Sequence, residues 1–272
     1  MKKKSQTIIC YSIEILVLAI FIFSYIYLFL NSIKSNGQYY EDPWGFADEA
    51  HWENYTNFLT NFGAAKYWFN TIIYSAIAIL LSLPISMLCA FALRLDSRKN
   101  LTKTFLFLIV GLHFFPEVIT IEPFYRILSL IGAIRNHFAI IIMYIKALLP
   151  INIIFLYTTF RKVSDEIIDN YILDGLNWFR IFMIELPKIC KSEIVAMISL
   201  NLFVLFKDYT VAYIFINEDS FSTINVAISR YLSTANFNYP QYFAAIIMTE
   251  MPFYLIIIFA FVRNKPLDLN IY

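Results

Sequence analysis

The chain alternates between long apolar runs and short polar or basic segments. Thr71 to Leu93 contains no charged residue, and Ile15 to Ser32 is a second run of this kind. A helix of about 20 apolar residues crosses the hydrocarbon core of a membrane. Four further runs carry embedded charges but are otherwise as apolar. The pattern predicts six membrane spans, at about Thr7–Leu30, Thr71–Leu93, Thr104–Glu122, His137–Phe160, Ile194–Ile216 and Gln241–Val262.

Composition supports this interpretation. Of the 272 residues, 60% are hydrophobic and 15% charged, which is more apolar than a soluble core of this size needs. We therefore predict an all-α, polytopic membrane protein. Residues 1–66 would form a first helix and an outer loop, residues 67–263 a membrane domain with the other five helices, and residues 264–272 a short tail.

The basic residues predict the orientation, because Lys and Arg are retained in cytoplasmic loops. If the Lys2-Lys3-Lys4 end is cytoplasmic, most of the 21 Lys and Arg residues fall on that side. Both termini are then cytoplasmic, and so is the segment from Ser164 to Pro187. The first apolar run is longer than that of a signal peptide and has no small-residue cleavage site, so we expect a retained anchor.

The segment from Ser164 to Pro187 has the pattern of two short amphipathic helices hinged at Gly175. Ser164 and Asn177 can cap the two helices, and Gly175 can adopt the left-handed conformation that ends the first. Pro187 is expected to end the second helix. The apolar face of the second helix would consist of Phe179, Phe182, Met183 and Leu186.

The pattern Asp174-Gly175, Phe179-Arg180 and Leu186-Pro187 resembles the EAA loop of ABC-importer permeases, through which these subunits dock onto an ATPase. The Asp before the Gly is most similar to the carbohydrate-uptake branch, the relatives of the second maltose-permease subunit. Asp169-Asn170-Tyr171 stands where the family has Glu-Ala-Ala, and the interval from Gly175 to Pro187 is one residue shorter. The resemblance covers about Tyr67 to Arg263, because further family features stand in their places: Asn70-Thr71, Pro116, Pro123-Phe124-Tyr125 and Arg161-Lys162.

The resemblance implies a type I ABC importer permease fold and a permease subunit that carries a carbohydrate or related polyol. The chain would be a transport subunit and not an enzyme, in the cytoplasmic membrane of a prokaryote. Its implied partners are a homologous permease subunit, two ATPase subunits and an extracytoplasmic substrate-binding protein; no nucleic acid is expected. The residues that the resemblance assigns to ATPase coupling are Glu166, Asp169, Asp174, Gly175, Phe179, Arg180, Phe182, Leu186 and Pro187.

No Gly-x-x-x-x-Gly-Lys-Ser/Thr motif is present, so ATP would be hydrolysed by a partner chain and this chain would bind no cofactor. His51, His113 and His137 form no HExxH motif, and the three cysteines have no metal-ligand spacing. Neither an intramembrane enzyme nor a metal site is therefore indicated. A secondary transporter without an ATPase, and a permease for a solute other than a sugar, remain as alternatives. The amphipathic segment could also rest on the lipid surface.

Four charged residues lie within predicted spans, where a charge is costly: Glu117, Lys146, Asp208 and Glu250. Two interpretations stand side by side: Lys146 pairs with Glu117 or Glu250 as a structural contact, or the four charges line the substrate path. Asp208 falls where the family has a polar break. The outer segment, about Ile33 to Lys66, is either a solvated loop with interfacial aromatics or a docking surface for the substrate-binding protein.

Overall fold

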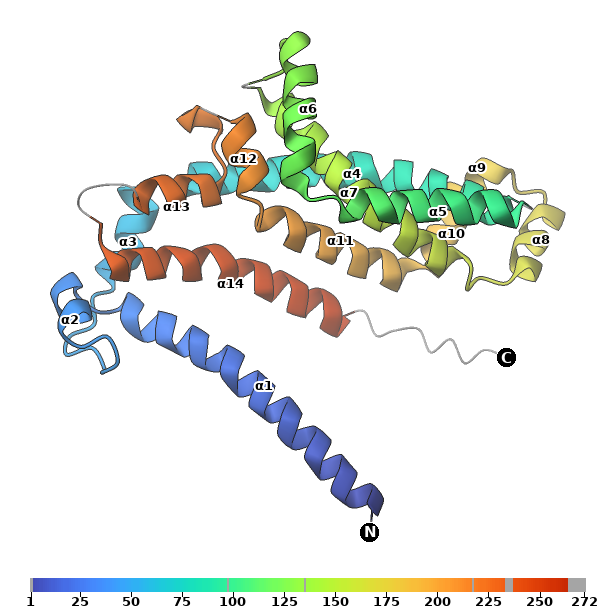
Figure 1. Ribbon diagram of the computed structural model, residues 1–272. Coiled ribbons are helices and arrows are strands. Elements are labelled where there is room, and N and C mark those ends of the chain that lie inside the picture. The colour runs from blue at the N-terminus through green and yellow to red at the C-terminus, as the bar shows by residue number, and fades with distance from the viewer. Residues whose placement is uncertain (1, 97, 135, 217, 233–236, 264–272) are drawn as a thin grey trace. The chain divides into compact units, whose positions relative to one another are not determined.

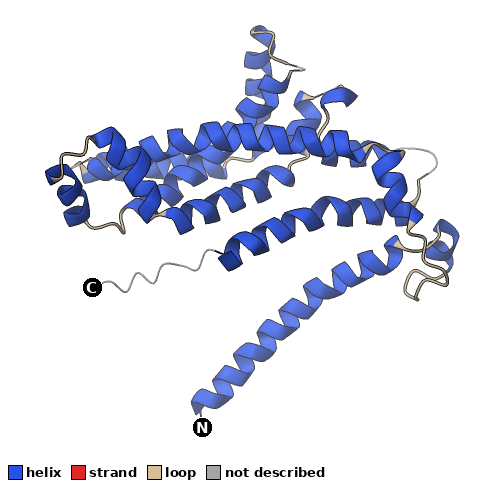
Figure 2. Ribbon diagram, turned by 180° about the vertical axis from the view of Figure 1, so that it is seen from behind, coloured by secondary structure: helices blue, strands red, loops and turns tan. Residues whose placement is uncertain are grey.

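The computed structural model describes residues 2–96, 98–134, 136–216, 218–232 and 237–263. Within these residues the secondary structure is helical and no strand occurs (Figure 2), which confirms the all-α prediction. The chain divides into two compact units. The first comprises Met1–Lys66 and Ile228–Pro252, and the second comprises Tyr67–Ala227 together with the residues from Phe253. The predicted domain division, at residues 66 and 263, stays a prediction.

In the first unit, the segment after α1 (Lys2–Ser32) is folded. It contains α2 (Asn36–Glu41) and α3 (Glu53–Thr60). Lys34 is fully buried, and its ammonium group donates to the carbonyl of Asp42 at 2.8 Å. The side-chain amide of Asn54 donates to the carbonyls of Ser32 (2.9 Å) and Lys34 (3.0 Å). These contacts satisfy the backbone groups at the end of α1 and give the outer segment a defined conformation.

Aromatic contacts join this segment to α14 (Tyr239–Arg263). The rings of Tyr39 and Tyr239 stack with centroids 5.1 Å apart. On α1 itself, Tyr27 meets Phe243 of α14 edge-on at 6.4 Å. By contrast, the most apolar stretch of α1 has no buried residue within the chain. A helix that is apolar all round and unburied needs lipid or another helix around it.

The second unit contains two continuous long helices, α4 (Ala64–Leu95) and α7 (His137–Phe160), and two bent helix pairs (Figure 1). The first bent pair corrects the predicted third span. Helix α5 (Lys99–Phe114) ends before Pro116, and α6 (Glu117–Leu130) leaves at 95°. Pro116 disfavours a helical conformation at Phe115, which is extended with φ −64° and ψ 129°. Thr104–Glu122 is therefore not one straight helix.

The predicted span Ile194–Ile216 is interrupted at Lys207–Tyr209, between α11 (Lys191–Phe206) and α12 (Thr210–Phe215). Side chains satisfy the backbone groups that this break frees. The carboxylate of Asp208 accepts from the N–H groups of Val211 (3.1 Å) and Ala212 (3.0 Å). Asn225, on α13 (Ile224–Leu232), donates to the carbonyl of Phe206 at 2.6 Å. Irregular backbone is tolerated at membrane depth where its N–H and C=O groups have hydrogen-bond partners of this kind within the protein.

Among the described residues, three helices, α1, α4 and α7, are long and apolar enough to cross a membrane. The two bent pairs add one further candidate each, which gives up to five. The second bent pair runs from Trp178–Ile189 into Lys191–Phe206. The sixth predicted span coincides with α14, whose side chains are described only in part. The chain is thus a multi-pass membrane protein, and the count of six stays a prediction.

Candidate functional site

The segment between α7 and α11, which we call the coupling segment (residues 164–189), lies at one end of the second unit (Figure 1). It consists of α8 (Asp165–Leu173), α9 (Trp178–Arg180), a π-helical turn (η1, Ile181–Glu185) and α10 (Leu186–Ile189). Two acidic residues, Asp165 and Glu166, occupy the first turn of α8, where they suit the helix dipole. Ser164 stands at the N-cap position in extended conformation, but its side chain makes no capping hydrogen bond.

Gly175 is the hinge that the sequence predicts. Its φ is +77°, in the left-handed region. The N–H of Gly175 donates to the carbonyl of Ile172 and the N–H of Leu176 to that of Tyr171, both at 3.0 Å. These two bonds form a Schellman motif, which satisfies the last carbonyls of α8. A Cβ at Gly175 would meet no atom within 4 Å, so the constraint on this position is the backbone conformation alone.

The second helix starts as predicted but does not end as predicted. The side-chain carbonyl of Asn177 accepts from the N–H of Arg180 at 2.8 Å. Helical backbone then continues through η1, where the N–H of Leu186 donates to the carbonyl of Ile181, and through α10 to Ile189. Pro187 lies inside this run. A proline normally disrupts the hydrogen bonds of the preceding α-helical turn, but here that turn is a wider π turn, which accommodates it.

Helix α4 holds the coupling segment in place. One nitrogen of the Arg94 guanidinium, Nη2, donates to the carbonyl of Val163 at 2.7 Å and to the carboxylate of Asp165 at 2.9 Å. Phe91 lies one turn earlier, and its ring packs against those of Phe182 (5.5 Å) and Trp178 (6.0 Å). Sequence analysis did not single out Arg94, because its partners lie about 70 residues away along the chain.

The burial pattern corrects the predicted contact face. Phe182 and Leu186 are 3% and 1% exposed and belong to a core shared with α4, α7 and α11, so they are not available to a partner. Phe179 is 67% exposed. Other large apolar side chains of the coupling segment are also exposed. We call this set, with Phe179, the outer face: Ile167, Ile172, Leu173, Trp178, Phe179 and Ile184.

Other predicted coupling residues lie in the same segment. Four of them are charged and exposed: Glu166, Asp169, Asp174 and Arg180. Pro187 is half-buried beside the core. Several exposed apolar side chains within one short segment, with charged residues among them, are typical of a protein or membrane interaction site. The amphipathic segment thus buries one apolar face in its own subunit and presents a second one outward.

The predicted path charges have local partners in the described residues. Lys146 donates to the hydroxyl of Thr120 at 2.6 Å and lies 5.4 Å from the centroid of the Phe124 ring. Asp208 accepts from the hydroxyl of Tyr144 at 3.0 Å, besides capping α12. Glu250 belongs to the first unit, where the hydroxyl of Tyr25 donates to it at 3.5 Å. The side chain of Glu117 lies outside the described residues. These contacts favour structural roles, and a substrate path through the four residues stays a prediction.

Two asparagines that sequence analysis passed over are fully buried in the second unit: Asn152 on α7 and Asn201 on α11. Among the described residues, neither amide finds a hydrogen-bond partner. A buried polar group without a partner costs free energy and is uncommon in a native protein. A lone Asn in an apolar run was the only signal that could have drawn attention to them.

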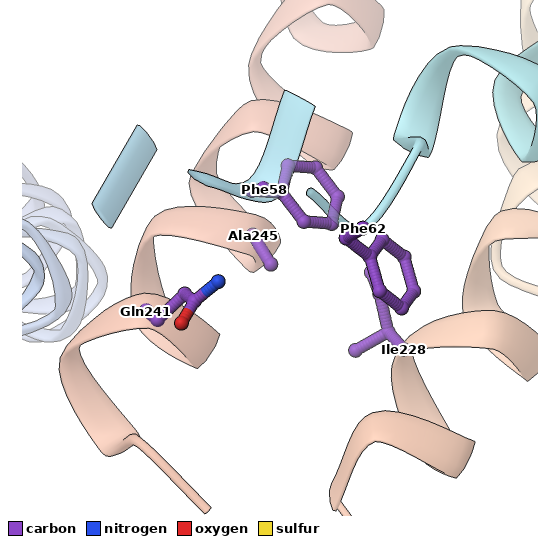
Figure 3. A pocket seen from close by; sticks show the side chains of 5 residues that line it. All are labelled: Phe58, Phe62, Ile228, Gln241 and Ala245. Atoms are coloured by element: carbon purple, nitrogen blue, oxygen red, sulfur yellow. The ribbon is translucent and has the colours of Figure 1, made fainter. Parts of the chain in front are cut away.

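Two hollows differ greatly in size. A gap of about 10 Å³ in the first unit is lined by Phe58, Phe62, Ile228, Gln241 and Ala245 (Figure 3). It can hold about one water molecule at most, so it is a packing gap and not a solute site. A cleft of about 530 Å³ in the second unit opens beside the start of the coupling segment, with Arg94 and Asp165 in its wall.

Comparisons with known proteins show what the chain as a whole is similar to. No family model matches the chain. It is 24% identical over 251 residues to the diacetylchitobiose uptake system permease protein NgcG of Streptomyces coelicolor, covering 91% of this chain and 82% of that protein. It is also 24% identical to the melibiose/raffinose/stachyose import permease protein MelC of Bacillus subtilis, with 92% and 90% covered. A bacterial ABC transporter that imports the polysaccharide alginate has a chain of the same fold, with a TM-score of 0.78, 20% identity and 97% of both chains covered.

The fold is therefore that of an ABC importer permease subunit, and the predicted fold class is confirmed. The resemblance noted from the Asp174-Gly175 and Leu186-Pro187 pattern is also confirmed, since the chain is similar along most of its length to permease subunits of sugar-uptake ABC transporters. These relatives are transport subunits and not enzymes, as expected for this chain.

We expect Gly175→Val to block transport while the subunit still reaches the membrane. A residue with a Cβ pays about 1–2 kcal/mol in the left-handed region, and a β-branched one is strained further. Gly175→Asn is the matched control, because Asn tolerates this conformation and the surrounding space is open. Solute uptake and membrane abundance of both variants are the measurements. Equal uptake by the Val variant and the wild type would show that the hinge conformation is not needed.

Proposed function

We propose that this chain is the permease subunit of a binding-protein-dependent ABC importer and that it carries an oligosaccharide or a related glycoside. ATP is hydrolysed on a separate chain, and this chain binds no cofactor. The observation that carries the proposal is the outer face: exposed apolar side chains with charged residues among them, on a segment mounted on the membrane domain by buried contacts. The names of NgcG, MelC and SmoH, the sulfoquinovosyl glycerol transport system permease protein of Agrobacterium fabrum, support a glycosidic cargo.

In the proposed mechanism the coupling segment transmits movement of the ATPase pair to the membrane helices. A displacement of the outer face reaches α4 through the Phe91–Phe182 ring contact and the bond from Arg94 to the Val163 carbonyl. It reaches α11 directly, because Cys190 and Met197 belong to the same core as Phe182. A packed core transmits such displacements with little loss, and rigid helices then carry them to the solute gate.

The outer segment suits the proposed docking of a substrate-binding protein. Its fixed backbone presents several exposed aromatic side chains among acidic ones: Tyr40, Trp44, Phe46 and Trp52. Exposed aromatic residues are enriched at protein interfaces. A solved alginate transporter in complex with a pentasaccharide-bound periplasmic protein shares the fold, with a TM-score of 0.68 and 16% identity. The unburied apolar stretch of α1 is available to lipid or to a homologous permease subunit.

The proposed orientation places both termini and the coupling segment in the cytoplasm of a prokaryote, and the outer segment outside the cytoplasmic membrane. The distribution of Lys and Arg supports this orientation. It also sets the coupling segment on the side where ATP is available, with two ATPase subunits shared between this chain and its homologous partner.

Phe179 and Phe182 form a matched pair that tests the ATPase contact. Phe179→Ala should leave the stability of the subunit unchanged but weaken copurification of the ATPase about tenfold, because an exposed aromatic anchor is lost. Phe182→Ala should instead destabilise the subunit itself, by about 3–5 kcal/mol, because the ring is buried. Thermal stability in detergent and ATPase copurification are measured for both. A Phe179→Ala subunit that copurifies as well as the wild type contradicts the proposed contact.

Labelling of introduced cysteines tests the orientation. In a background without Cys10, Cys89 and Cys190, single cysteines at Asp48 and Asp219 should react with an impermeant thiol reagent in intact cells. Cysteines at Asn177 and Arg180 should react only after the membrane is opened, and all four positions are exposed in the structure. Labelling of the Asn177 position from outside would remove the coupling segment from any cytoplasmic ATPase.

Uptake into proteoliposomes tests the cargo. The complete complex, with its ATPase and substrate-binding protein, should accumulate a labelled oligosaccharide on addition of ATP. An excess of unlabelled glycosides should compete, whereas amino acids should not. The Gly175→Val complex serves as the uncoupled control. Competition by amino acids with no effect of any glycoside would refute the carbohydrate assignment and leave the importer mechanism standing.

A further inference from the structure

The cleft of about 530 Å³ in the second unit is strongly charged. Three cationic side chains line it, from three different helices or their ends: Arg94, Lys103 and Arg161. Two acidic residues, Asp96 and Asp165, line it as well, and Tyr157 supplies an aromatic wall. The guanidinium of Arg161 lies 5.8 Å from the centroid of the Tyr157 ring. The cleft therefore has a net positive lining that comes from parts of the chain far apart in sequence.

Arg94 has binding capacity that the protein does not use. Its side chain is only 6% exposed, yet the nitrogen Nη1 has no hydrogen-bond partner among the described residues. The other terminal nitrogen, Nη2, already serves Val163 and Asp165. A buried, charged N–H group without an acceptor is costly. Because Nη1 is itself buried, an acceptor in the cleft would reach it only after a small turn of the side chain.

The two acids of the cleft are already engaged. Asp96 accepts from the backbone N–H (3.1 Å) and the side chain (3.2 Å) of Arg98, and from the hydroxyl of Thr102 (3.2 Å). The backbone N–H of Arg98 is the main cause that lowers the pKa of Asp96, so this carboxylate stays ionised and does not donate a proton to a ligand. Asp165 is bound to Arg94. Lys103 and Arg161 remain exposed, and an anion would be attracted to them and to Arg94.

The position of the cleft identifies the kind of anion. Its lining begins at the end of α4 and includes the start of α5 and the end of α7. The apolar spans thus end where the cleft begins, at the level at which phospholipid headgroups lie. Basic pockets between the ends of membrane helices bind anionic headgroups, and basic residues beside a membrane are attracted to anionic lipids.

We propose that this cleft binds the phosphate headgroup of an anionic phospholipid such as phosphatidylglycerol, with Arg94 as the buried cation of its wall and Lys103 and Arg161 as the exposed cations. The headgroup would sit beside Val163 and Asp165, at the start of the coupling segment. The proposal depends neither on the solute nor on the ATPase. The proposed orientation only decides that the leaflet is the cytoplasmic one.

Native mass spectrometry of the full chain tests the proposal. The purified chain in detergent is mixed with equal amounts of phosphatidylglycerol and phosphatidylcholine that have the same acyl chains. We expect retained phosphatidylglycerol to exceed phosphatidylcholine, and Arg161→Gln and Lys103→Gln each to lower this preference about fivefold. Lys162→Gln is the matched control, because it removes the same charge from a neighbouring exposed residue that does not line the cleft. Its preference should equal that of the wild type.

Three results would overturn the proposal. One is equal retention of the two lipids by the wild type, and a second is an equal loss of preference in Lys162→Gln and Arg161→Gln. In the third, inorganic phosphate binds the chain, Arg161→Gln weakens that binding, and phosphatidylglycerol does not compete with it, which would assign the cleft to free phosphate. If no lipid preference exists and Arg161→Gln abolishes ATPase copurification, the cleft belongs to the ATPase interface. Because Arg94→Gln would also loosen the coupling segment, the exposed residues and not Arg94 carry the test.

Discussion

The guanidinium of Arg94 joins the end of α4 to the start of the coupling segment, and the arrangement of the site depends on this joint. By binding the carbonyl of Val163 and the carboxylate of Asp165, it determines where α8 begins. The Schellman turn at Gly175 then determines the direction in which the chain returns. After this turn the returning chain buries Phe182 and Leu186 in the core that it shares with α4, α7 and α11. Phe179 and Leu173 are left outside because the buried side is already occupied.

A second constraint explains the broken helices. A membrane domain tolerates non-helical backbone only where polar groups are satisfied within the protein. At Lys207–Tyr209 the carboxylate of Asp208 and the amide of Asn225 provide that satisfaction, and the hydroxyl of Tyr144 ties the break to α7. Asn152 and Asn201 are the opposite case, since their buried amides find no partner among the described residues. A permease passes through more than one conformation. A second conformation can give these two amides the hydrogen bonds that they lack in this one.

The features predicted correctly from sequence are those that local chemistry determines. Gly175 ends a helix because few other residues tolerate a positive φ, and Asn177 caps the next because its side chain reaches the first free N–H groups. The prediction placed Phe179 and Phe182 together on one apolar face. It did not foresee that Phe182 is buried and Phe179 exposed, because only the packed core distinguishes the two positions. Pro187 was expected to end the helix, and the π turn that accommodates it has no simple sequence signal. The pairing of Arg94 with Asp165 is long-range and could not be predicted from spacing.

The same joint that orders the coupling segment also carries the unused hydrogen-bonding capacity of the cleft. Nη2 of Arg94 donates to Val163 and Asp165, and the buried Nη1 has no partner among the described residues. An anion bound in the cleft would leave the hydrogen bond from Arg94 to the Val163 carbonyl in place. It would, however, share the positive charge of Arg94 with the carboxylate of Asp165. Asp165 is almost fully exposed and Arg94 almost fully buried, so the buried partner holds the salt bridge in place while the exposed one is free to adjust. In the proposed scheme, the start of α8 is the point at which a bound headgroup would act on the segment that is proposed to meet the ATPase.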